Sequence, residues 1–214
     1  MQLKNKNLLN IFNIKDVNDQ SMTLLVLALL PGLFVTKSIE ATLIYLLLYA
    51  IFIILVTLVF KLIEKIVPND INWIVVIVSV VGVSAFVAIL ANAFFVNFAK
   101  DYELFIYLFA VSSLPYMLNA DNEKKNVGKS LVNSLQSFIG LVIIMLFVSI
   151  LREVIGTGMI VFGNYSEISF NVNLFSKNAI SIINEPLGAI IILGLLLAAI
   201  QLGLNKKGER AWHI

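Results

Sequence analysis

The sequence predicts an all-α integral membrane protein with six spans, on the evidence of its composition and its long apolar runs. Of its 214 residues, 60% are hydrophobic and 13% are charged, whereas soluble globular domains carry about 25% charged residues. The mean hydropathy is +0.97. Transmembrane β-strands alternate apolar and polar residues, and the long apolar runs of this chain do not. A helical membrane domain is therefore expected.

Charge and residue usage exclude several classes of function. The chain has 15 basic and 13 acidic residues without a basic stripe, which argues against a nucleic-acid-binding protein. It has no cysteine, so disulfides, thiolate–zinc sites, cysteine nucleophiles and iron–sulfur clusters held by its own thiolates are excluded. The chain has one histidine, His213, next to its last residue, which excludes His-rich metal sites.

Six apolar runs predict the spans, and a bilayer core takes about 20 helical residues to cross. With flanking residues, the second, third, fifth and sixth runs reach that length. The first and fourth are shorter, and each contains a proline, Pro31 and Pro115. The runs are Thr23–Val35, Ala41–Val59, Trp73–Phe95, Leu104–Leu118, Leu135–Leu151 and Leu187–Leu204.

The basic residues predict the orientation of these spans in the cell (cytoplasmic) membrane. Residues 1–20 are expected to form a polar cytoplasmic segment whose clustered apolar positions make it a candidate interfacial helix. Residues 21–204 are expected to form the membrane domain, and residues 205–214 a cytoplasmic tail. Basic residues concentrate on the cytoplasmic side of membranes. With both termini in the cytoplasm, only Lys37, Lys100, Arg152 and Lys177 lie outside. The longest outer stretch, residues 156–185, is expected to be a loop rather than a seventh span.

The two short runs predict an inverted repeat. Leu30–Pro31 and Leu114–Pro115 interrupt corresponding spans of residues 22–100 and 104–204. Three spans in each repeat place the second copy in the membrane in the opposite direction. Because proline removes a backbone donor, the two spans are expected to be broken half-helices. Paired interrupted spans indicate a site near the midplane of the membrane.

Four stretches, in order, resemble one family. Leu151–Gly158 (LREVIGTG) is similar to that family's "REIIGxG", and Val35–Ala41 (VTKSIEA) to its "VT…LET". Leu90–Phe94 (LANAF) resembles "LMNAY", and Pro186–Ala189 (PLGA) resembles "PPGAF". The family is that of the paired six-span membrane subunits of the Rnf complex and the Na⁺-translocating NADH:quinone oxidoreductase (Nqr) complex. The first stretch is typical of the Rnf E and Nqr D subunits.

The resemblance implies a subunit of a redox-driven, ion-translocating electron-transport complex, at most non-catalytic by itself. It implies a homologous six-span partner subunit of opposite orientation and flavin on other subunits. Members hold a [2Fe–2S] cluster with cysteines at the positions of Leu30 and Leu114, and an arginine at Asn119. Leucine cannot ligate iron, so this chain is expected to be a divergent member that binds no cofactor alone.

The remaining polar residues leave alternatives open. Arg152 and Glu153 are candidates for an ion-path gate or a subunit contact, or for an interfacial anchor whose arginine extends to the headgroups. Asn92, Asn97, Ser112 and Ser113 form a candidate polar path, or only hydrogen bonds between helices. Glu40 suits the positive end of the second helix. An E/D-type subunit, a small-solute secondary transporter and a purely structural membrane subunit are the three functional hypotheses, and neighbouring genes would discriminate between them.

The predicted topology is testable with reporter fusions. A fusion after Val35 is expected to report an outer location and one after Leu118 a cytoplasmic location, because the basic residues sort in that way. The opposite pair of results would reverse the orientation.

Overall fold

The computed structural model describes residues 31–63, 72–112, 127–166, 169–174, 179–196 and 198. These residues are mostly helical, as predicted. After a short helical segment at residues 31–35, the elements are α2 (Ile39–Ile63), α3 (Asn72–Phe94), α4 (Val96–Tyr107), α6 (Val127–Thr157), β1 (Met159–Phe162), β2 (Phe170–Asn173) and the 3₁₀ helix η5 (Ser181–Ile183). A short apolar helix, Pro186–Leu196, follows.

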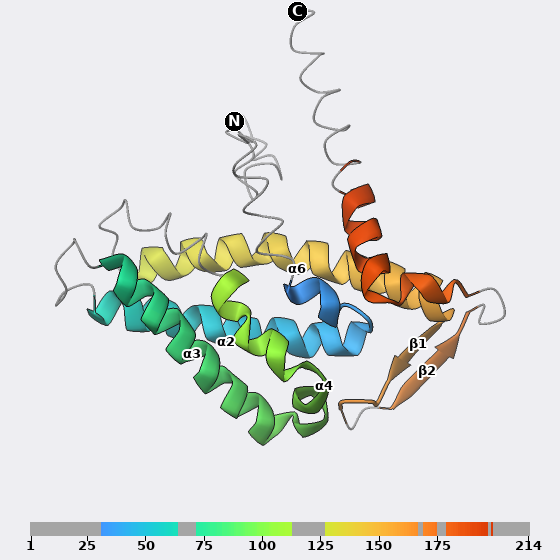
Figure 1. The fold of residues 1–214 in the computed structure, drawn as a ribbon, viewed down its shortest axis with the longest axis horizontal. Helices are drawn as coiled ribbons and strands as arrows, with labels where there is room; N and C mark the ends of the chain where they lie inside the picture. Colours follow the sequence, from blue (N-terminus) through green and yellow to red (C-terminus); the bar gives the residue numbers. More distant parts are fainter. Residues whose placement is uncertain are drawn as a thin grey trace, which may run out of the picture.

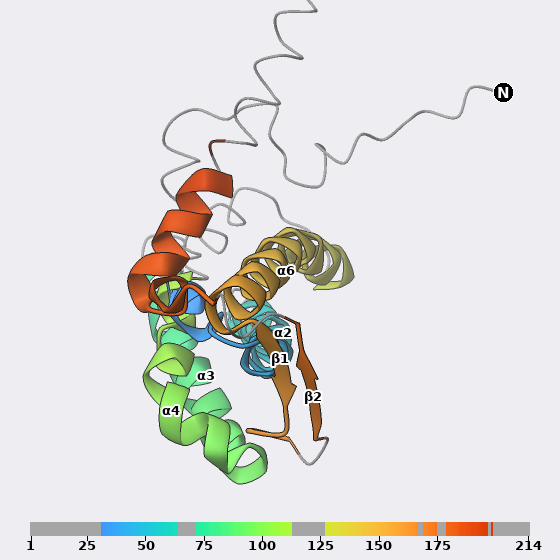
Figure 2. The ribbon, with the colours of Figure 1, turned by 90° about the vertical axis from the view of Figure 1, so that its right-hand side faces the viewer.

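The helices pack around α2. In Figure 1, α2 and α6 lie side by side and run in opposite directions along the long axis, while α3 crosses α2 obliquely and α4 turns back beside it. Figure 2 looks along α2 and α6 and shows α3 and α4 on one side of α2. The β-hairpin lies where α6 ends and α2 begins.

Three described helices are long and apolar enough to cross a membrane: Ile39–Phe60, Ile74–Phe94 and Phe138–Thr157. They correspond to the second, third and fifth predicted runs. The sixth run is represented by Pro186–Leu196. Six spans and an inverted repeat stay predictions, because much of the first and fourth runs lies outside the described residues. Residues 1–20 and 205–214, Leu30, Ser113, Leu114, Pro115 and Asn119 also lie outside them.

The connection between the third and fourth runs differs from the sequence-based expectation. The third and fourth predicted runs leave residues 96–103 unassigned between them, and the structure has α4 there, beginning at Val96 after α3 ends at Phe94. Backbone hydrogen bonds continue across the bend, with the Phe95 N–H donating to Ala91 and the Phe95 carbonyl accepting from Ala99, both at 2.8 Å. The buried face of α4 consists of Phe98, Ala99, Tyr102 and Ile106. In the sequence Lys100, Asp101 and Glu103 lie between these residues, so no continuous apolar run indicates the helix.

The stretch 156–185, which was expected to be an outer loop, contains regular structure. β1 and β2 pair antiparallel, from Met159 opposite Asn173 to Phe162 opposite Phe170, and η5 follows. β1 has the sequence MIVF, in which branched and aromatic residues favour a strand.

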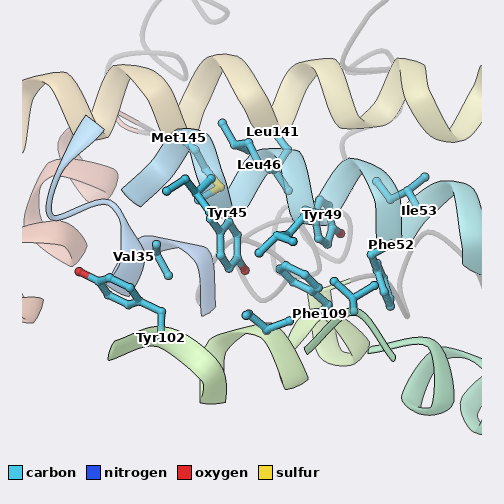
Figure 3. Packing of buried hydrophobic residues seen from close by; sticks show 14 of the residues in the cluster. Val35, Tyr45, Leu46, Tyr49, Phe52, Ile53, Tyr102, Phe109, Leu141 and Met145 are labelled. Atoms are coloured by element: carbon cyan, nitrogen blue, oxygen red, sulfur yellow. The ribbon is translucent and has the colours of Figure 1, made fainter. Parts of the chain in front are cut away.

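Aromatic side chains of α2 fill the centre of the core. Tyr45, Tyr49 and Phe52 lie one turn apart and surround the ring of Phe109, with ring centroids 4.9, 5.0 and 5.3 Å from it (Figure 3). Such aromatic pairs add about 0.5–1.5 kcal/mol beyond the burial of their area. The core therefore ties α2 to the described start of the fourth apolar run.

Two glycines of the last helix give a matched test of its packing. A Cβ on Gly188 would collide with the backbone carbonyl of Ile183, whereas a Cβ on Gly194 would meet no atom within 4 Å. Gly188→Ala is expected to destabilise the protein by about 1–3 kcal/mol, and Gly194→Ala to leave its stability equal or slightly higher. Thermal unfolding in detergent measures both. Equal midpoints for the two variants would contradict the described packing.

Candidate functional site

The most polar buried group is Arg152, in the last turns of α6, whose side chain is 1% exposed. Its guanidinium donates five hydrogen bonds, which use all five of its N–H groups. The acceptors are Leu33 O (2.8 Å), Thr36 Oγ1 (2.8 Å), Ile183 O (3.2 Å), Asn184 O (2.9 Å) and Glu185 O (3.2 Å).

These acceptors lie where two helical segments end. Leu33 belongs to the short helix that ends at Val35, and its carbonyl also accepts the Thr36 hydroxyl at 2.6 Å. The other three carbonyls belong to Ile183, the last residue of η5, and to Asn184 and Glu185, which follow it. The last carbonyls of a helix have no partner within the helix, and Arg152 supplies one. The interpretation of Arg152 as an anchor that extends to the headgroups is therefore wrong, because its guanidinium is enclosed within the chain.

Glu153, the next residue of α6, accepts backbone N–H groups from two other elements. Its carboxylate accepts the N–H of Ile39 at 2.5 Å and that of Val161 at 2.8 Å. Ile39 is the first residue of α2, whose free N–H groups favour a negative charge. Glu153 thus joins the end of α6 to the beginning of α2 and to β1.

Glu40 forms a second carboxylate site, with the loop after β1. It is 2% exposed and accepts the N–H groups of residues 163–166 at 3.2, 3.0, 3.1 and 2.7 Å. The Ser166 hydroxyl adds a bond at 2.7 Å. Gly163 has a φ of 112°, a conformation that glycine adopts without strain and that turns successive N–H groups toward one anion. Beyond its expected place at the start of α2, Glu40 therefore holds the hairpin loop.

The same loop also contacts α4. The Tyr165 hydroxyl donates to Asp101 at 3.0 Å, and its ring meets Phe98 and Tyr102 edge-on at 5.9 Å. Burial raises the pKa of Tyr165, and Tyr102 and Asp101 raise it further, so the phenol stays protonated at neutral pH.

The other candidate residues lie elsewhere. Asn92 is exposed at the end of α3, and Asn97 is exposed at the start of α4. Ser112 is buried, and its hydroxyl lies beside the Tyr45 phenol. A role for these residues, or for Arg152 and Glu153, in a polar path or a subunit contact stays a prediction.

The sequence analysis missed the loop 163–166, which binds Glu40. The Gly163-Asn164 pair, which is typical of a turn, was the signal that could have indicated it.

The residues present do not fit the iron–sulfur cluster that the resemblance implies. Such clusters are held by thiolates, and the chain has none. Among the described residues, no group of three or more His, Cys, Asp or Glu side chains could hold a metal ion.

Arg152 is expected to be irreplaceable for stability. Arg152→Ala leaves the carbonyls of Leu33, Asn184 and Glu185 without this donor, at an expected cost of about 3 kcal/mol or more. Arg152→Lys keeps the charge but has three donors on one atom, so we expect most of the same loss. Thr36→Val, which removes one bond of the set, is the milder control. Unfolding in detergent measures all three, and wild-type stability of Arg152→Lys would contradict the role of the five bonds.

Comparison with known proteins places this network in a family. A family model for "Rnf-Nqr subunit, membrane protein" matches residues 8–197, which include Glu40, Arg152, Glu153 and all their hydrogen-bond partners. No curated protein matches the chain. The family match covers most of the 214 residues and agrees with the four resembling stretches, so the chain belongs to the Rnf-Nqr family of membrane subunits.

Proposed function

We propose that this chain is an E/D-type membrane subunit of an Rnf/Nqr-like, redox-driven, ion-translocating complex and that it lacks its own iron–sulfur ligands. The observation that carries the proposal is the family match over residues 8–197. A role in such a complex follows from membership of the family, whose subunits work in multi-subunit membrane assemblies.

The E/D assignment is supported by the run Leu151–Gly158. It resembles the stretch that distinguishes these subunits. Its two charged residues bond to four other parts of the chain: the end of the first apolar run, the start of α2, the hairpin and the end of η5. A change of sequence there would alter several contacts at once. Because the run makes these contacts, its sequence is tied to the fold, which supports its use as a marker of the subunit type.

The absence of cysteine from the sequence supports a scaffold role for this chain in electron transfer. Electrons that cross the complex must use cofactors on other subunits, flavin among them. This chain contributes a membrane helix bundle and the contacts that place a partner. The expected partner is a homologous six-span subunit of opposite orientation.

A purely structural membrane subunit is the second candidate. One observation favours it: the buried charges Glu40, Arg152 and Glu153 are all engaged by backbone groups or hydroxyls. Groups so engaged are suited to holding elements together rather than to exchanging an ion.

Purification of the tagged chain in mild detergent tests the proposal. We expect a second six-span subunit and flavin-bearing subunits to co-purify, and deletion of the gene to abolish redox-driven ion uptake by membrane vesicles. Co-purification without any effect of deletion on uptake would favour the structural candidate. A monomer without redox partners would contradict both the E/D-type subunit and the purely structural subunit.

The cluster hypothesis is tested by restoring the ligands. The wild-type chain is expected to lack the visible absorbance of an iron–sulfur centre, because it offers no thiolate. Leu30→Cys combined with Leu114→Cys, expressed with a partner that carries its own cysteine pair, is expected to gain that absorbance if the scaffold geometry is retained.

Each single substitution is the control, since one added thiolate leaves the set of ligands incomplete. A stable, partner-bound double variant without a signal would show that the site has lost its cluster geometry. That result would shift the assignment toward the structural subunit or the transporter.

A further inference from the structure

The β-hairpin is held in place by polar contacts rather than by a share of the apolar core. It extends from the end of α6 to α4 (Figures 1 and 2). Among the described residues, no side chain of β1 or β2 belongs to the buried core or packs against it, and Tyr165 is the one residue of the loop 163–166 that does. Segments with few buried apolar contacts open locally at a low cost in free energy. The hairpin is therefore suited to opening while the helices stay folded.

Two glycines bracket β1 in conformations that suit a hinge. Gly158 has a φ of 67° and Gly163 a φ of 112°, values that glycine adopts without strain. Hinges are often small residues that absorb a change in backbone angles. Rotation at Gly158 would move β1 together with its loop, and rotation at Gly163 would move the loop alone.

Polar groups are buried beneath the loop. The ring of Tyr165 lies edge-on to that of Tyr102, with centroids 5.9 Å apart. Burial raises the pKa of the Tyr102 phenol and the charge of Arg152 opposes this shift, so the phenol and the guanidinium lie near each other. Arg152 in turn donates to Thr36 Oγ1 at 2.8 Å. These polar groups lead from the loop to the end of the first apolar run.

Two carboxylates fasten the loop over these groups. Glu40 accepts the four consecutive N–H groups of residues 163–166 and the Ser166 hydroxyl. Asp101 on α4 accepts the Tyr165 hydroxyl at 3.0 Å. Hydrogen bonds to a charged acceptor are stronger than neutral ones, and most of those that hold the loop share the single acceptor Glu40. The loop is therefore held at two points, and one carboxylate controls the larger.

We propose that residues 163–166 are a lid, latched by the Glu40 carboxylate and by the Tyr165–Asp101 hydrogen bond, which opens to let water and the translocated ion reach the polar groups at Thr36 and Arg152. The ion in this inference rests on the proposed function. The opening of the lid rests on the contacts of the hairpin alone.

Thiol labelling tests the opening. The chain has no cysteine, so Phe98→Cys, at a fully buried position beside the Tyr165 ring, introduces a single reporter. A water-soluble methanethiosulfonate is expected to label it slowly, and about tenfold faster when Glu40→Gln is added, because the amide nitrogen of glutamine cannot accept N–H groups. Hydrogen–deuterium exchange at the amides of residues 163–166 needs no thiol and is expected to rise by the same factor.

Two variants control for indirect effects. Glu103→Gln neutralises a carboxylate of α4 that bonds to Asn92 and Tyr107 and not to the loop, so it should leave both rates unchanged. Met145→Cys, fully buried in α6, reports unfolding of the helices and should stay unlabelled when Glu40→Gln is added. Unchanged labelling and exchange in Glu40→Gln, or equal labelling of the Met145→Cys and Phe98→Cys reporters, would overturn the lid.

A reversible lock tests what the lid controls. The side chains of Asp101 and Tyr165 touch, so Asp101→Cys and Tyr165→Cys can be joined by a short bis-methanethiosulfonate, which a reductant removes. Joining them is expected to lower redox-driven ion uptake by membrane vesicles about tenfold or more, and the reductant to restore it. Val161→Cys with Asn171→Cys is the matched pair: these residues lie opposite each other within the hairpin, so joining them should leave uptake unchanged.

Undiminished uptake with the lid locked to α4 would show that the ion does not pass beneath it and would overturn that part of the inference. If vesicles of the unmodified protein show no redox-driven uptake, the proposed function fails. Labelling and exchange still decide in that case whether the loop opens.

Discussion

A helix that stops inside a membrane protein leaves backbone carbonyls without partners, and no water is available in hydrocarbon to satisfy them. In this protein the guanidinium of Arg152 meets that need for two helical ends at once, with bonds of 2.8 Å to Leu33 and 2.9 Å to Asn184. Only a planar group with five fixed donors can serve acceptors on two sides. Arg152 thus joins both the short helix at residues 31–35 and the end of η5 to α6.

Two other charged residues are buried in the described part of the chain, and both are opposite to Arg152 in sign. The cation bonds to carbonyls at helix ends, whereas the anions Glu153 and Glu40 accept N–H groups at the start of α2 and in the hairpin loop. Each charge therefore lies where backbone dipoles of the opposite sign converge. This explains how a hairpin of two four-residue strands, too small to be stable alone, keeps a defined place: its backbone is bonded to carboxylates that the membrane helices hold.

The parts of this fold that the sequence predicted are those governed by local apolar patterning. Continuous apolar runs predicted α2, α3 and α6, because hydrocarbon selects for them. The helix α4 was missed since Lys100, Asp101 and Glu103 interrupt the run while Phe98, Tyr102 and Ile106 form its buried side. The partners of Arg152 could not be predicted, because Leu33 is 119 positions away along the chain and a backbone carbonyl carries no signature in the sequence. For the same reason Glu40 was assigned to its own helix end and not to the loop that it holds.

The hydrogen bonds of Arg152 do not depend on thiolate side chains, of which the chain has none. Arg152 bonds to the carbonyl of Leu33, to a hydroxyl and to three carbonyls at and just after the end of η5. None of these bonds involves the side chain of Leu30 or Leu114. A carbonyl is the same acceptor whether its residue is cysteine or leucine. Replacing a thiol with an apolar side chain therefore removes iron ligation without removing a donor or acceptor from this hydrogen-bond network. Iron ligation and this hydrogen-bond network are therefore separable, so a chain without thiolates can retain the network.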